Sequence, residues 1–228
     1  MLSPELRLSM LQFINVSKRY SDSGEVLSDV SFQLEKGEMA FLTGHSGAGK
    51  STLLKLIPVI ERPNKGQILF EGRPINRISK RQVPLLRRKL GLIFQDYRLL
   101  HDRSVFDNVA LPLLVAGYGQ QETARRVRAA LDKVGLLRKE KRYPLALSGG
   151  EQQRVGIARA IVHKPSLILA DEPTGNLDPA LASEIMDLFK EFNQVGVTLL
   201  VASHNLDLIS RFACRTLKLQ QGRLIEGG

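Results

Sequence analysis

Tryptophan is absent from this sequence and cysteine occurs only once, and each scarcity narrows the possible functions. Aromatic residues make up 6 % of the chain, which leaves little material for stacking on single-stranded nucleic acid. The single Cys214 excludes an internal disulfide and is typical of a reducing compartment. Apolar stretches fall short of the roughly 20 residues that span a bilayer. Glu5 and Arg7 also break the N-terminal run that a secretory signal needs, so any action at a membrane is expected from the cytosol, through a partner.

The 228-residue chain carries a formal net charge of +10. A basic protein usually meets nucleic acid, an anionic membrane surface or phosphate ligands. The positive residues gather in three groups: Lys80, Arg81, Arg87, Arg88 and Lys89; Arg125, Arg126 and Arg128; and Arg138, Lys139, Lys141 and Arg142. These groups are either solvated helix faces or a surface that faces the anionic cytoplasmic leaflet of the membrane. In the second case each basic side chain contributes about 1 kcal/mol to the free energy of membrane binding. No nucleic-acid-binding module is recognisable, so we expect no nucleic-acid partner.

Strand-like and helical patterns alternate along most of the chain. The predicted strands are 11–16, 31–34, 39–43, 67–70, 91–94, 167–170, 197–202 and 216–219, and the predicted helices are 50–57, 122–134, 149–162, 180–194 and 205–212. Runs as uniformly apolar as 167–170 and 197–202 are typical of a parallel sheet that is covered on both faces. From Leu99 to Leu147 the spacing of apolar residues is helical instead. The sequence therefore predicts one α/β domain with a helical insert.

A glycine-rich loop follows the apolar run 39–43. Its residues Gly44 to Ser51 match the phosphate-binding pattern GxxxxGK[ST], between a strand and a helix as the mechanism requires. Glycines let several backbone N–H groups point at one polyphosphate, and the helix adds the positive end of its dipole. Lys50 supplies a charge for the β- and γ-phosphates, and the Ser51 hydroxyl can ligate Mg²⁺. The predicted nucleotide-binding residues of this loop are Gly44, His45, Ser46, Gly47, Ala48, Gly49, Lys50, Ser51 and Thr52.

Two carboxylates follow the apolar strand 167–170. A carboxylate at the carboxyl end of a parallel strand lies beside the phosphate-binding crevice, so Asp171 is expected to hold Mg²⁺ directly or through water. Glu172 is expected to polarise the attacking water as general base. The alternative is that Asp171 and Glu172 only form a turn that ends the strand. The presence of a phosphate-binding loop in the same chain argues against that alternative.

The segment Leu147–Gln153, LSGGEQQ, resembles the signature motif of ATP-binding-cassette (ABC) ATPases. Together with the phosphate-binding loop, the Asp171–Glu172 strand, Gln95 and His204, it places the family's motifs in order along the whole chain. The resemblance implies a homodimer in which Ser148, Gly149, Gly150 and Gln152 of one subunit close over the γ-phosphate held by the other. ATP and Mg²⁺ are the implied cofactors, and ATP hydrolysis is the implied reaction.

Further site residues are carried over from the same resemblance. Tyr20 is similar to the aromatic residue that stacks on adenine, and Gln95 to the glutamine that touches Mg²⁺ and water. Asn176–Asp178 resembles the loop that crosses the dimer interface. His204 resembles the histidine that hydrogen-bonds the γ-phosphate and orients the general base. Without the family's other motifs, a single histidine at this place would be interpreted as a hydrogen-bonded core or surface residue.

The resemblance also implies an architecture. A P-loop NTPase core with a mostly parallel sheet is expected at 1–95 and 156–228, with a small antiparallel β subdomain. A helical subdomain is expected at about 96–155.

Several segments outside the shared motifs resemble the cell-division branch of the family, including Gly37–His45, Ile93–Asp96 and Asp107–Ala110. This implies peripheral attachment at the cytoplasmic face of the inner membrane through an FtsX-like integral membrane protein, with control of cell-wall hydrolases. Leu99, Leu100, Val105 and Leu113 are candidates to line the partner's groove, and packing inside the helical lobe is the favoured interpretation of them. Two alternative functions remain open. The chain could be the ATPase subunit of a lipoprotein-release or export transporter, or a scaffold in which nucleotide binding matters and hydrolysis is incidental.

Overall fold

The computed structural model describes residues 9–22 and 24–225, and the predicted N-terminal interruption at Glu5 and Arg7 lies outside them. Six strands form the central sheet in the order β10-β9-β3-β8-β7-β6. Their bounds are β3 Met39–Thr43, β6 Leu90–Ile93, β7 Leu167–Asp171, β8 Thr198–Ala202, β9 Arg215–Gln220 and β10 Arg223–Ile225. All neighbours pair in parallel except β10, which is antiparallel to β9. The carboxyl ends of the central parallel strands therefore meet at one edge of the sheet.

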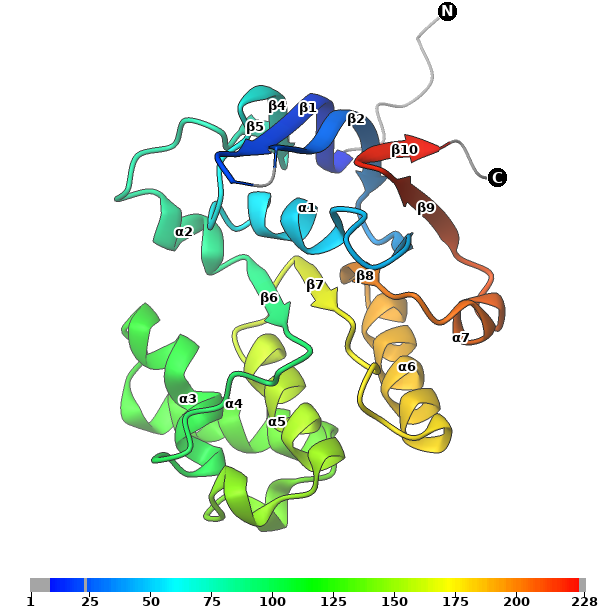
Figure 1. Ribbon diagram of the computed structural model, residues 1–228. Coiled ribbons are helices and arrows are strands. Elements are labelled where there is room, and N and C mark those ends of the chain that lie inside the picture. The colour runs from blue at the N-terminus through cyan, green and yellow to red at the C-terminus, as the bar shows by residue number, and fades with distance from the viewer. Residues whose placement is uncertain (1–8, 23, 226–228) are drawn as a thin grey trace, which may run out of the picture.

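A second, antiparallel sheet has the order β2-β1-β4-β5. It consists of β1 Ser9–Tyr20, β2 Gly24–Glu35, β4 Lys65–Phe70 and β5 Arg73–Pro74. The helix α1, Lys50–Leu56, lies between this sheet and the central one (Figure 1). Leu53 and Leu56 of α1 are buried in the same cluster as residues of both sheets.

The central strands are apolar throughout because both of their faces are covered. Leu167 and Leu169 of β7 pack into the cluster around α1, whereas Ile168 and Ala170 pack into the cluster on the opposite face. That opposite face is covered by α5, Gly149–Ile161, and α6, Pro179–Gln194. The alternating direction of side chains along a strand thus divides one apolar run between two cores.

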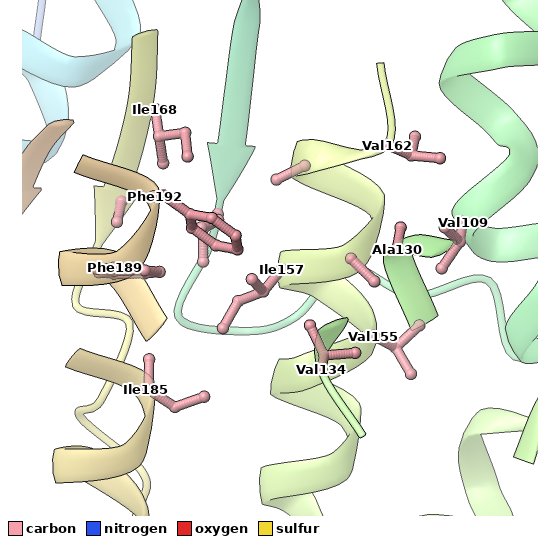
Figure 2. Close-up of a cluster of buried hydrophobic side chains, with 14 of the residues drawn as sticks. Val109, Ala130, Val134, Val155, Ile157, Val162, Ile168, Ile185, Phe189 and Phe192 are labelled. Atoms are coloured by element: carbon pink, nitrogen blue, oxygen red, sulfur yellow. The ribbon is translucent and has the colours of Figure 1, made fainter. Parts of the chain in front are cut away.

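The helical lobe is inserted between β6 and β7 (Figure 1). It contains α3 Val105–Ala116, α4 Gln120–Lys133, two short 3₁₀ helices at Leu137–Lys139 and Pro144–Ala146, and the start of α5. Figure 2 shows Ile157 of α5 directed toward Phe189 and Phe192 of α6, while Val155 faces the lobe. The helix α5 therefore belongs to the lobe and to the central domain at once. The predicted subdomain boundary at 155/156 falls inside it, and that division remains a prediction.

The predicted fold class is confirmed: a mostly parallel core sheet, a small antiparallel sheet and a helical insert. The elements not predicted individually are β5, β10, α2 at Val83–Arg87, α3 and the two short 3₁₀ helices. The helix predicted at 205–212 is shorter, with α7 at Leu206–Ser210. No helix of the described residues has both the length and the apolar character that crossing a membrane requires.

Leu99, Val105 and Leu113 do not line a partner's groove. All three are buried in the core cluster of the lobe, which confirms the favoured interpretation. Only Leu100 of that set is exposed. The 3.6-residue pattern marks a helix face as apolar, but it does not say whether the lobe itself or a partner covers that face.

Candidate functional site

A cavity of about 830 Å³ opens at the carboxyl ends of β3, β7 and β8. This is the edge of a parallel sheet where ligands of α/β proteins bind. The predicted residues that line it are Gly44, His45, Ser46, Gly47, Ala48, Gly49, Lys50, Ser51, Thr52, Gln95, Asp171, Glu172 and His204. One cavity thus brings together segments that are far apart in the sequence.

The loop between β3 and α1 depends on glycine at specific points. Gly44 has φ of 151°, and a Cβ atom there would lie 2.3 Å from the carbonyl oxygen of Leu219. Gly49 has φ of 106°, and a Cβ atom there would lie 2.8 Å from Leu27 Cδ2. The loop therefore lies so close to β2 and β9 that these two positions leave no room for a side chain.

Gly44→Ala is expected to destabilise the nucleotide-free protein more than Gly47→Ala does. Both positions have positive φ, which costs an L residue roughly 1–2 kcal/mol. Only Gly44 adds a steric clash, because nothing lies within 4 Å of a Cβ atom at Gly47. The additional cost is that of overpacking, about 1–3 kcal/mol. Urea denaturation without nucleotide measures the difference, and equal losses in the two variants would contradict the account of the Leu219 contact.

Lys50 is buried at the start of α1 and spans the loop. Its Nζ donates to the carbonyl oxygens of Gly44, at 2.7 Å, and His45, at 3.3 Å. The same Nζ lies 3.7 Å from Glu172 Oε1. The arrangement gives the cavity a positive charge at the point where the loop's glycines leave space for an anion.

Glu172 immediately follows β7 and has a left-handed backbone, with φ of 48°. Such a conformation is rare for a residue with a side chain and is concentrated at functional sites. Its N–H donates to Ala202 O at 2.9 Å, which fixes the turn against β8. His204 Nδ1 lies 2.9 Å from Glu172 Oε2. The imidazole thus lies against a carboxylate that lines the cavity.

Asp171 is the last residue of β7 and presents a buried oxygen, Oδ1, with no hydrogen-bond partner among the described residues. Burial raises the pKa of this carboxyl, and a hydrogen bond from Ser51 acts in the opposite direction. Groups of three or more His, Cys, Asp or Glu that could hold a metal do not occur in the described part of the chain. The unpartnered oxygen and the Ser51 hydroxyl nevertheless fit Mg²⁺, which prefers few carboxylates together with phosphate oxygens and water.

The predicted signature residues lie outside this cavity. Ser148 caps α5: its hydroxyl accepts from Glu151 N, and the Glu151 carboxylate accepts from Ser148 N. Lys139 pairs with the same carboxylate and lowers the Glu151 pKa. Ser148 and Gly149 are exposed, while Gly150 packs against Leu181. Among the described residues, Ser148, Gly149, Gly150, Gln152 and Tyr20 do not line the cavity of their own chain.

Several lining residues were not predicted, namely Val26, Thr43, Leu206, Lys218, Leu219 and Gln220. Most of them lie on β2 and β9, and β9 is brought to the site because it pairs with β3. The register that sets Thr43 beside Lys218 joins segments 175 residues apart, and no local motif marks it.

The fold and the site together define an ABC-type ATPase. The profile of the ABC transporter family matches residues 27–175, and the chain belongs to this family. Among its relatives is the cell division ATP-binding protein FtsE of Escherichia coli K12, 60 % identical over 218 residues, which cover 96 % of this chain and 98 % of the relative. The FtsE protein of Haemophilus influenzae is 54 % identical over 94 % of this chain and 99 % of its own length. The predicted resemblance to the cell-division branch is confirmed.

Solved structures agree with this assignment. The dimeric structure of MJ0796, described as a bacterial ABC transporter cassette, has a TM-score of 0.88 and is 34 % identical; the match covers 95 % of this chain and 97 % of that one. A dimer of the same cassette bound to ADP and Pi, described as a post-hydrolysis state, gives a TM-score of 0.87. The predicted ATPase activity is in keeping with both.

Proposed function

We propose that this ATPase is the nucleotide-driven subunit of a bacterial cell-division complex, with an FtsX-like integral membrane protein as its partner. The observation that carries the proposal is the 60 % identity to FtsE over nearly the full length of both chains. The chain then acts peripherally at the cytoplasmic face of the inner membrane. Its ATP cycle serves as a mechanical signal to cell-wall hydrolases on the other side.

The working unit is a two-fold dimer in which each nucleotide lies between two copies of the chain. The dimeric MJ0796 structures support this arrangement, because their fold matches along nearly the whole chain. The exposure of Ser148 and Gly149, outside their own cavity, supports it as well. Ser148, Gly149, Gly150 and Gln152 of one copy close over the γ-phosphate held by Gly44–Thr52 of the other, and Asn176–Asp178 crosses the interface.

Within each site, Lys50 neutralises the β- and γ-phosphates. Glu172 accepts a proton from the attacking water as the water oxygen bonds to the γ-phosphorus and ADP leaves. His204 orients that carboxylate, and Tyr20 stacks on the adenine from the end of β1. Ser51, Gln95 and Asp171 would hold Mg²⁺, which, when bound, neutralises charge that develops on the phosphates.

The partner's docking site is assigned to a groove of about 820 Å³ between the central domain and the lobe, in place of the buried leucines. Its lining residues are Pro84, Arg87, Arg88, Leu90, Leu92, Phe94, Arg98, Leu111, Pro112, Val115, Ala116, Gly117, Tyr118, Arg159, Ala160 and His163. Apolar side chains alternate with four arginines, and none of the lining residues is acidic. The groove therefore suits an apolar cytoplasmic segment that carries carboxylates.

Val115→Glu is expected to abolish co-purification with the membrane partner while leaving the ATPase rate of the isolated protein unchanged. Val115 is 73 % exposed in the groove, so the substitution spares the core and brings a carboxylate to the groove's arginines. Val195→Glu is the matched control, because Val195 is 79 % exposed and lies outside the groove. The measurement is affinity purification from detergent-solubilised membranes, followed by identification of the retained protein.

Two outcomes would contradict the proposal. Equal retention by both variants would remove the groove as the docking site. Recovery of a multi-span exporter permease or a lipoprotein-release protein in place of an FtsX-like protein would overturn the cell-division role and favour a transport function for the same ATPase.

A further inference from the structure

The helix α5 connects the signature turn to a second functional loop. It begins at Gly149, after the Ser148 cap, and carries Arg159 ten residues further on. The loop that follows β6 and contains Gln95 passes alongside this helix (Figure 1). A continuous α-helix has all its backbone hydrogen bonds within the segment, so its two ends move together.

Arg159 binds the backbone of that loop directly. Its guanidinium donates to the carbonyl oxygens of Tyr97, at 2.7 Å, and Arg98, at 2.6 Å. Arg159 is half-buried and forms no ion pair with a carboxylate of residues 9–22 or 24–225. A guanidinium is a planar fork of donors, so two consecutive carbonyls can be held by one side chain.

The two residues held by Arg159 both have left-handed backbones, with φ of 56° at Tyr97 and 47° at Arg98. This region is sparsely populated for residues with a side chain, and two in succession persist only where the surroundings enforce them. Arg159 is one of the groups that hold this shape, together with the hydrogen bond from Tyr97 N–H to Phe94 O at 3.3 Å and the Arg98 guanidinium over the Phe94 ring at 4.2 Å. The shape of the loop after Gln95 therefore depends in part on α5.

Tyr97 reaches the other end of the same helix. Its hydroxyl lies so close to the signature turn that a Cβ atom added to Gly149 would be 3.2 Å from it. Its carbonyl is meanwhile held by Arg159, and Phe94 and Arg98 line the groove on the far side of the loop. One residue thus contacts both the start and the end of α5, between the groove and the signature turn.

We propose that Arg159 is a positioning residue that clamps the Gln95 loop onto α5, so that a segment seated in the groove and the Ser148 turn move as one body. The clamp acts on closure of the two copies rather than on the capture of ATP, because neither Arg159 nor Tyr97 lines the nucleotide cavity. The inference rests on the proposed dimer with shared nucleotides.

The test separates ATP capture from dimer closure. Arg159→Met keeps the bulk of the side chain and removes both hydrogen bonds, and it is compared with Arg159→Lys, which keeps the charge. Arg128→Met, at an exposed arginine of α4 that pairs with Glu140, is the control. ATP affinity is measured with a fluorescent ATP analogue, and closure is measured by analytical ultracentrifugation with ATP in the Glu172→Gln background.

Arg159→Met removes the two hydrogen bonds from the guanidinium to Tyr97 O and Arg98 O. We therefore expect about a tenfold fall in kcat and in ATP-dependent dimerisation. Its KM for ATP and its affinity for the analogue stay within about twofold of the wild-type values, and Arg159→Lys gives an intermediate result. Wild-type kcat and dimerisation in Arg159→Met would overturn the proposal. An equal loss of ATP affinity would also overturn it, because that result indicates a general folding role.

A second pair of variants tests the Tyr97 end of the clamp. Gly149→Ala places a methyl group 3.2 Å from the Tyr97 hydroxyl, and we expect this crowding to weaken ATP-dependent dimerisation several-fold. Tyr97→Phe removes the hydroxyl that lies 3.2 Å from the added methyl group, and it should restore most of the loss in the same chain. Absence of rescue would contradict the contact's role. If the Glu172→Gln protein without further substitutions fails to dimerise with ATP, the proposed dimer is wrong. The proposed role of Arg159 is then wrong as well, because it depends on that dimer.

Discussion

Glu172→Gln is expected to lower the rate of ATP hydrolysis by about 10²–10⁴-fold, the contribution of a well-placed general base. The substitution keeps the size of the side chain and removes its ability to accept the proton of the attacking water. ATP binding persists, because the backbone cradle and Lys50 are unchanged. The consequence is an ATP-bound dimer that accumulates instead of turning over, measurable as phosphate release together with sedimentation in ATP.

The control for this prediction is Glu184→Gln. Glu184 is an exposed glutamate on α6 that pairs with Arg154 at 3.2 Å, and its replacement should leave turnover at the wild-type rate. Wild-type hydrolysis by Glu172→Gln would show that another group accepts the proton. The His204 contact at 2.9 Å would then have to be interpreted as structural.

Lys50→Ala is expected to weaken ATP binding by about 10- to 150-fold, because hydrogen bonds to charged groups contribute roughly 1.5–3 kcal/mol. The variant loses the charge that faces the phosphates. It also loses the bonds to Gly44 O and His45 O that span the loop. Titration with a fluorescent ATP analogue measures the loss, and hydrolysis falls in parallel because less nucleotide is bound.

Lys55→Ala provides the matched control on the same helix. Lys55 is an exposed residue in the last turn of α1 and does not line the cavity. Its variant should bind ATP as the wild type does, despite carrying the same change in net charge. Comparable losses in both variants would mean that the general positive field, rather than the placement of Lys50, attracts the nucleotide.

Much of this molecule was predictable because local patterns determine it. The pattern GxxxxGK[ST] after an apolar strand places the loop that begins at Gly44 at the end of β3. The uniformly apolar run 167–170 marks β7, whose carboxyl end puts Asp171 and Glu172 in the same cavity. In each case the residues that carry the signal are neighbours in sequence, and their chemistry requires one particular setting.

The remaining features depend on contacts between distant segments. Leu99 and Leu113 are apolar whether the lobe or a partner covers them, so their burial could not be read from their spacing. Lys218 reaches the cavity only through the pairing of β9 with β3. The short elements β5 and α2 offer too few residues for a periodic signal, since two and five residues respectively do not fill a repeat.

The loop after β6 borders two cavities: Gln95 lines the nucleotide site, while Phe94 and Arg98 line the groove. Thermodynamic linkage between two sites on one protein is reciprocal. If a segment bound in the groove tightens ATP binding by some factor, then ATP must tighten the grip on that segment by the same factor. A membrane protein seated there would therefore sense the cellular supply of ATP as a change in its own affinity, even before any bond to phosphate is broken.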